Sequence, residues 1–201
     1  MPDLPQGSAE AVEVHPVTAD RWDDLVALAG ERGFTSGCWC MWWRVTSREY
    51  AERHGDGLRG EMHDIVVSGR EPGLLAYVGG EPAGWVAVAP RVEFPRLDRS
   101  RKLKPVDEQP VWSITCFAID RSHRRQGLAA TLLDAAVAFA RGRGAAVVEA
   151  YPIDTEGGKR SGADLFTGTL AMFRRAGFSE VARREGRPIV RVDVAAPFIR
   201  G

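Results

Sequence analysis

The segment from Phe117 to Ala129 constrains the fold more than any other part of the chain. An apolar run ends at Ile119, a short polar turn follows, and a basic stretch containing Gly127 opens a long helical pattern rich in Ala and Leu. The first backbone N–H groups of a helix have no partner within it, and the helix dipole favours negative charge there. A strand that leads through a basic turn into a helix therefore predicts a binding site for a phosphorylated ligand.

The composition is that of an ordinary globular protein, with 44% hydrophobic and 27% charged residues. Lys+Arg and Asp+Glu balance at 27 each, so we expect no nucleic acid partner and no anionic membrane surface. No apolar run reaches the roughly 18–20 residues that span a bilayer. The three cysteines are an odd number, which argues against a disulfide framework and favours a cytoplasmic location.

The length of 201 residues predicts a single domain over residues 12–201. Residues 1–11 carry Pro, Gly, Ser and acidic residues without the pattern of a signal peptide, so we expect a flexible N-terminal tail.

Hydrophobic periodicity predicts a mixed α/β (α+β) fold. We expect a first helix that begins at Trp22 and ends near Gly30 or Gly33, and further helices over 58–68, 127–141 and 164–175. A long connection without periodicity is expected over 91–110. The expected strands are 12–17, 73–78, 83–89, 111–119, 145–150, 178–184 and 188–194, with a hairpin turn at 79–82.

The basic turn also carries a sequence motif. Arg124–Ala129 matches the pattern (Gln/Arg)-x-x-Gly-x-(Gly/Ala), as does Arg141–Ala146, but only the first match follows a strand and opens a helix. Ala171–Phe178 adds an aromatic-centred helical turn that ends in Gly-Phe before a strand. In these features the chain resembles the GNAT superfamily of acetyl-CoA-dependent N-acetyltransferases over roughly residues 12–194.

The resemblance implies a mostly antiparallel central sheet with flanking helices, whose two central parallel strands splay apart to admit acetyl-CoA. The strand end would contact the pantetheine arm, through backbone N–H groups of Phe117 and Ile119 on either side of Ala118. The amides of Gln126, Gly127, Leu128 and Ala129 would hold the pyrophosphate. Arg124 and Arg125 would add positive charge, or are solvated surface residues.

The implied activity is transfer of an acetyl group to a primary amine by direct attack in a ternary complex. The alternative is a GNAT-fold module that binds acyl-CoA without catalysis, because Phe173 stands where many family members carry the Tyr that protonates the leaving thiolate. Tyr151 is the candidate substitute acid, or an aromatic side chain that packs beside Pro152. Glu149 is the candidate base, or a paired carboxylate.

A segment rich in Trp and Cys, residues 38–44, follows the first helix. In the GNAT topology this segment walls the acceptor site, so Trp39, Trp42 and Trp43 are candidate substrate-binding residues. Their rings would hold a cationic amine, stack on a planar group, or form only a packed aromatic cluster. Cys38 and Cys40 lack zinc-knuckle spacing, and we expect no metal. The expected partner is a small-molecule or peptide amine, and because dimers are common in the family a homodimer is one expected assembly.

Overall fold

The computed structural model describes residues 11–156 and 165–195. Seven strands form one sheet in the order β1-β2-β3-β4-β5-β7-β6. Only β4 and β5 pair in parallel; the other neighbours are antiparallel. The strands are β1 (Val12–Pro16), β2 (Gly73–Val78), β3 (Glu81–Pro90), β4 (Trp112–Ile119), β5 (Val147–Ala150), β6 (Ser179–Arg184) and β7 (Arg187–Asp193). The expected mixed, mostly antiparallel sheet is confirmed.

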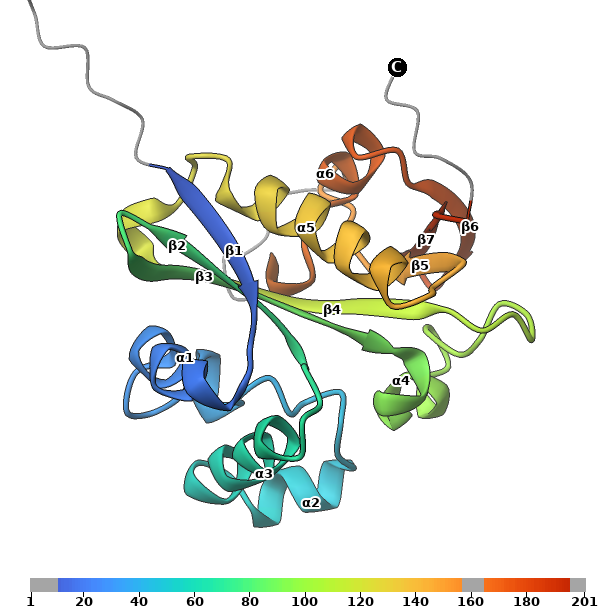
Figure 1. The fold of residues 1–201 in the computed structure, drawn as a ribbon. Helices are drawn as coiled ribbons and strands as arrows, with labels where there is room; N and C mark the ends of the chain where they lie inside the picture. Colours follow the sequence, from blue (N-terminus) through green and yellow to red (C-terminus); the bar gives the residue numbers. More distant parts are fainter. Residues whose placement is uncertain (1–10, 157–164, 196–201) are drawn as a thin grey trace, which may run out of the picture.

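Helices cover both faces of this sheet (Figure 1). α5 (Leu128–Gly142) and α6 (Leu170–Arg175) lie on one face, while α1 (Trp22–Ala29), α2 (Ser47–Glu52) and α3 (Asp56–Val67) lie on the other, and α4 (Pro95–Arg99) follows β3. Alternate side chains of β3 serve the two layers: Val86 packs in the α5 cluster and Trp85 packs in the α1–α3 cluster. Both faces of the central strands are therefore buried.

The two central parallel strands separate soon after they meet. β4 pairs with β5 only from Trp112↔Val148 to Ile114↔Ala150, and β5 ends at Ala150. A bulge follows in β4, because Ala87 of β3 pairs with Cys116 while Val88 pairs with Ile114. A bulge bends its strand, and the half of β4 after it continues without a neighbouring strand on the β5 side. The expected splayed opening is confirmed.

Two expectations for the secondary structure were wrong. The helix expected over 164–175 is a 3-10 turn, η5 (Leu165–Thr167), followed by α6. The break falls at Gly168, whose φ of +78° leaves the helical region, and Thr169 then caps α6 by accepting from the Met172 N–H. Asp164 lies outside the described residues. The connection over 91–110 is not irregular throughout, since it contains η3 (Arg91–Glu93) and α4.

The remaining 3-10 turns are η1 (Ala19–Arg21), η2 (Thr35–Gly37) and η4 (Arg121–His123). Over the two described ranges, no helix is long and apolar enough to cross a membrane.

Candidate functional site

One large cavity, of about 830 Å³, opens beside the free half of β4. It runs from the turn between β4 and α5 to the segment that follows α1. Its lining comprises Leu28, Ala29, Gly33, Phe34, Thr35, Cys38, Cys40, Trp42, Trp43, Tyr50, Cys116, Phe117, Ala118, Ile119, Asp120, Arg121, Arg124, Ala129, Leu165, Phe166, Gly168, Thr169 and Met172. We call the β4–α5 end of this cavity the cofactor mouth, and the end formed by Phe34, Trp42, Trp43, Tyr50 and Phe166 the aromatic chamber.

The cofactor mouth presents backbone donors that the protein does not use. Arg125 and Gly127 both have left-handed backbones, with φ of +65° and +84°, and consecutive N–H groups in such a turn form an anion-binding concavity. Within the described residues, no hydrogen bond engages the N–H groups of residues 125–129. A Cβ added to Gly127 would meet no described heavy atom within 4 Å. The donor set and the open space fit a pyrophosphate.

The free edge of β4 presents a second set of backbone groups. The Asp120 N–H donates to the Ala83 carbonyl of β3 at 2.9 Å. Because consecutive residues of a strand alternate in direction, the N–H groups of Phe117 and Ile119 face away from β3, toward the opening. The Ile119 carbonyl lies on the same side and accepts from Arg124 Nε at 3.2 Å. This edge could hold an extended amide-containing chain such as pantetheine.

A short side-chain network fixes the turn between these two donor sets. Asp120 accepts from the Ser122 N–H at 2.9 Å and from its hydroxyl. The Ser122 hydroxyl and N–H lower the pKa of Asp120 below its ordinary value. Gln126 Nε2 donates to the Ser122 carbonyl at 2.9 Å. The turn is therefore held from within, and its outward N–H groups remain free for a ligand.

The aromatic chamber contains two of the three expected tryptophans. Trp42 is 40% exposed, its ring meets Tyr50 edge-on with centroids 5.0 Å apart, and Trp43 packs against it at 6.4 Å. Trp39 lies outside the lining: it is 2% exposed and stacks on Trp22 at 6.1 Å in the core below the sheet. The segment thus divides between cavity wall and core.

Three thiols line the cavity, those of Cys38 and Cys40 and that of Cys116 on β4. Cys40 donates to Cys116 with 3.3 Å between the sulfurs, and Trp85 Nε1 donates to Cys40 Sγ at 3.0 Å. Burial raises the pKa of the Cys40 thiol, and the hydrogen bond with Cys40 raises the pKa of Cys38. Over the parts of the chain that the structure covers, no group of His, Cys, Asp or Glu is arranged to hold a metal ion.

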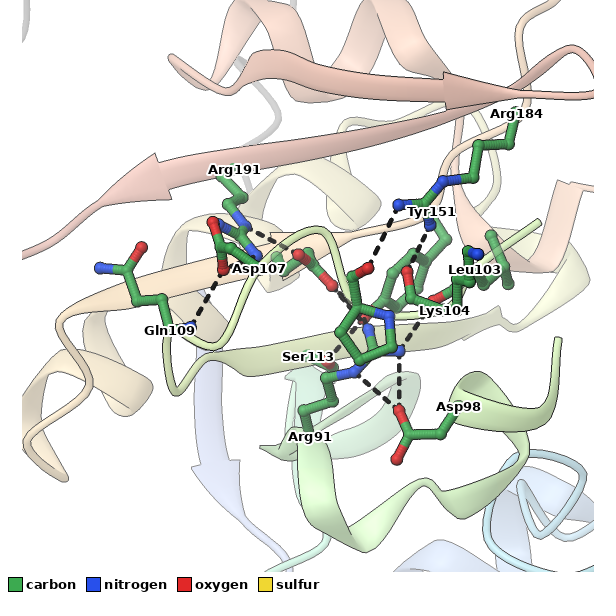
Figure 2. A network of polar contacts seen from close by, with 12 residues as sticks. Arg91, Asp98, Leu103, Lys104, Asp107, Gln109, Ser113, Tyr151, Arg184 and Arg191 are labelled. Atoms are coloured by element: carbon green, nitrogen blue, oxygen red, sulfur yellow. Dashed lines mark hydrogen bonds and ion pairs between the residues drawn. The ribbon is translucent and has the colours of Figure 1, made fainter. Parts of the chain in front are cut away.

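Tyr151 and Glu149, the candidate acid and base, lie outside the cavity lining. They belong to a buried ionic network, in which Figure 2 labels Tyr151, Arg91 and Arg191. Both are fully buried. Glu149 accepts from Arg91 Nη1, Arg191 Nε and the Tyr151 hydroxyl, each at 2.6–2.7 Å. Tyr151 also contacts Ser113 Oγ at 2.8 Å, and burial, followed by the nearby Glu149 charge, raises the pKa of its phenol. This placement favours the packing role of Tyr151 and the paired role of Glu149.

Phe173 is likewise a core residue. It is fully buried and packs edge-on against Phe117 and Phe178, at 6.2 and 5.0 Å. Phe173, where the resemblance implies a tyrosine, therefore supports Phe117 in the β4 wall of the cavity.

Sequence reasoning missed several residues of the lining. Leu28 comes from α1, Phe34 from the turn before η2, and Tyr50 from α2. Tyr50 sits on α2, whose N-terminus is fixed by a capping box between Thr46 and Glu49. That Thr-x-x-Glu signal is visible in the sequence and would have predicted the helix, although not the direction of Tyr50.

Comparisons with known proteins agree with this architecture. The acetyltransferase (GNAT) family model matches residues 39–160, and no curated protein matches the chain. A GNAT-family acetyltransferase from Listeria monocytogenes superposes with a TM-score of 0.56 at 10% identity, covering 90% of this chain and 94% of its own. A GNAT-family acetyltransferase from Desulfovibrio desulfuricans gives 0.54 at 19% identity, covering 92% and 100%.

A third structure was solved with a ligand. The PaiA N-acetyltransferase of Thermoplasma acidophilum, in complex with coenzyme A, gives a TM-score of 0.51 at 13% identity, covering 91% of this chain and 99% of its own. These likenesses concern the fold, whereas the family match covers the strand, turn and helix that form the cofactor mouth. The chain belongs to the GNAT family of acetyltransferases, for which acetyl-CoA is the acyl donor.

Proposed function

We propose that residues 12–201 form one catalytic domain that transfers an acetyl group from acetyl-CoA to a primary amine by direct attack in a ternary complex. The observation that carries the proposal is the continuous cavity that joins the free donors of the β4–α5 turn to a chamber walled by aromatic side chains. A donor and an acceptor entering from its two ends would meet beside the free half of β4.

The chain's own groups suit this reaction. The N–H groups of residues 125–129 would hold the pyrophosphate, with Arg124 adding charge at the rim. Bound acetyl-CoA supplies an acetyl group activated as a thioester. The Phe117 and Ile119 N–H groups would hold the pantetheine arm and polarise the carbonyl oxygen as negative charge grows on it. Trp42 and Trp43 would seat the acceptor, and water would carry away the proton that the amine loses.

The alternative, an acyl-CoA-binding module without catalysis, has one observation in its favour. Phe173 has no hydroxyl, and Tyr151 is buried outside the cavity lining, so neither residue offers a phenol to a leaving thiolate. Tyr50 is the tyrosine that lines the cavity within the described residues. Release of free thiol from acetyl-CoA across a panel of amines separates the two functions: amine-dependent release supports the enzyme, and tight binding of acetyl-CoA without release supports the module.

Substitutions at two glycines with the same backbone conformation test whether the cofactor mouth binds pyrophosphate. Gly127 and Gly144 flank opposite ends of α5, both have φ of +84°, and both open onto free space. Each stands in a copy of the same sequence motif. A glutamate at either site has a similar backbone cost of order 1 kcal/mol, but only the Gly127→Glu substitution would place bulk and negative charge where the pyrophosphate binds.

We expect Gly127→Glu to weaken coenzyme A binding at least tenfold in calorimetry, while Gly144→Glu leaves it within about twofold. Equal affinities in the two variants would refute the pyrophosphate assignment.

A further inference from the structure

The aromatic chamber already holds a cation of the protein's own. The Arg96 guanidinium lies 3.8 Å from the Trp42 ring centroid and 5.7 Å from that of Tyr50. A cation this close to an aromatic face occupies the position that a cationic ligand would take. Both rings line the cavity, so the charge stands directly behind the chamber wall.

Two hydrogen bonds hold Arg96 in this place. Its Nε donates to the Val45 carbonyl at 3.0 Å, and its backbone N–H donates to the Trp43 carbonyl at 3.3 Å. Arg96 is the second residue of α4, after Pro95, so its hydrogen bonds connect this helix to the chamber wall. The guanidinium is therefore a fixed part of the wall.

Arg96 makes the chamber electropositive. Burial has the strongest influence and lowers the pKa of Arg96, Tyr50 opposes this shift, and the neighbouring charge of Arg99 adds to it. Arginine nevertheless remains protonated in proteins. The charged residues of the cavity lining, Asp120, Arg121 and Arg124, stand at the cofactor mouth. An alkylammonium ion in the chamber would face Arg96 across a single ring, and repulsion between the like charges would disfavour its binding.

We propose that Arg96 makes this enzyme selective for an uncharged, planar aromatic amine over a cationic amine. This inference rests on the proposed N-acetyltransferase function. The remaining surfaces of Trp42 and Trp43 provide apolar and aromatic walls for a flat ring, together with Phe34 and Phe166 of the same lining. The cation–π attraction that would otherwise draw in an alkylammonium is already used by Arg96.

The charge state of the acceptor also fits the chemistry. The amine nitrogen forms a bond to the acetyl carbon with its lone pair, and the bond from that carbon to sulfur breaks with its electron pair on sulfur. The nitrogen loses one proton to water and the sulfur gains one, giving an amide and free coenzyme A thiol. An aromatic amine arrives uncharged, with its lone pair free, near neutral pH. An alkylamine arrives as a cation, and the positive charge of Arg96 disfavours its entry into the chamber.

Two amines that share one ring test the proposal. The aromatic amine is 4-methoxyaniline, which is uncharged at about pH 7.5, and the cationic amine is 4-methoxybenzylamine, which is protonated at that pH. The measurement is kcat/KM for each amine, from thiol release with saturating acetyl-CoA, in the wild-type protein and in Arg96→Gln, Arg96→Lys and Arg101→Gln. Arg101 is 89% exposed on the loop after α4 and controls for loss of any arginine. The two amines differ in intrinsic reactivity, but this difference cancels when the ratio of their kcat/KM values is compared between variants.

We expect Arg96→Gln to shift the kcat/KM ratio toward the cationic amine by about three- to tenfold, while Arg96→Lys and Arg101→Gln leave it within about twofold. Because Arg96→Gln also removes bonds that hold the wall, a second measurement uses the wild-type protein alone. Raising salt from about 0.05 M to about 0.5 M should shift the ratio in the same direction by screening Arg96.

A kcat/KM ratio that stays unchanged in both measurements overturns the proposal. Faster turnover of the diamine cadaverine than of both 4-methoxyaniline and 4-methoxybenzylamine overturns it as well. These outcomes leave the N-acetyltransferase function intact. Absence of thiol release with every amine would instead refute the proposed function.

Discussion

The cofactor mouth and the ionic network at the end of β5 both concentrate chemistry-bearing groups, and they treat those groups in opposite ways. At the mouth, the N–H groups of residues 125–129 have no partner among the described residues, and Arg124–Gly127 are exposed. In the network, Glu149 accepts three hydrogen bonds while fully buried. Unused donors open to solvent are available to a ligand, whereas buried groups that satisfy one another stabilise the fold.

The network joins elements that are distant in sequence. Arg91 lies at the start of the connection after β3 and reaches Asp98, the Leu103 carbonyl, Glu149 and Tyr151. Figure 2 shows these contacts converging between the connection and the sheet. The connection over 91–110 is thus anchored to β5 and β7 by charge, at the far end of the sheet from the cofactor mouth.

The largest expected effect is loss of the Glu149 carboxylate. Glu149→Ala leaves Arg91 and Arg191 without their shared buried partner, and removing one side of a buried ion pair costs about 3–5 kcal/mol of the free energy of unfolding. Urea denaturation measures this loss. Glu149→Gln, which keeps the shape and some of the hydrogen bonds, should lose less. A Glu149→Ala protein of normal stability but without turnover would return Glu149 to the role of catalytic base.

Tyr151→Phe should have a smaller effect on stability and little on turnover. The variant removes a buried hydroxyl that bonds to Glu149, Arg91 and Ser113, and leaving such partners unsatisfied costs about 1–3 kcal/mol. Turnover per folded molecule should stay within about twofold, because the phenol lies outside the cavity lining. A tenfold loss of turnover at unchanged stability would support Tyr151 as the proton donor and erase the distinction between the two regions.

Arg124→Gln should act only at the mouth. Arg124 is exposed and holds the Ile119 carbonyl on the free edge of β4, so its loss should weaken coenzyme A binding by about three- to tenfold with little change in stability. Arg141→Gln, in the second copy of the motif at the other end of α5, is the matched control and should leave affinity unchanged. Equal effects of the two variants would reduce Arg124 to a solvated surface residue.

The sequence predicted the cofactor mouth better than the ionic network, because the mouth depends on residues close together in the sequence and the network on residues far apart in it. Strand, turn and helix over 112–142 follow from local periodicity, a glycine and a basic turn. The network depends on Arg91 and Arg191 meeting Glu149 across 58 and 42 residues, which only the sheet order brings together. The same limit explains Trp39: periodicity cannot say which of three neighbouring tryptophans turns inward where Trp39 and Cys40 adopt left-handed backbones.

The contribution of the ionic network to stability should depend on pH at its exposed rim, the contact between Asp107 and Arg191. Arg191 bonds to both carboxylate oxygens of Asp107, at 2.7 and 3.0 Å, and together with the Gln109 N–H it holds the pKa of Asp107 below its ordinary value of 3.8. A carboxyl whose pKa is depressed in the folded state stabilises the fold above its unfolded pKa and loses that contribution as the pH falls through the folded value. Asp107→Asn should therefore lower the melting temperature slightly at pH 6 and not at a pH below the folded pKa.

The neighbouring Glu108, exposed on the same loop, provides the control for this smallest effect. Glu108→Gln should run parallel to the wild-type protein in a plot of melting temperature against pH, whereas Asp107→Asn should converge with the wild-type curve on its acid side. Other carboxylates whose pKa is lowered, Asp154 and Glu180 beside Arg183, contribute equally to all three curves and cancel in the differences. A constant offset of Asp107→Asn at every pH would mean that the Asp107–Arg191 contact stabilises the fold by packing, and that the network has no titrating rim.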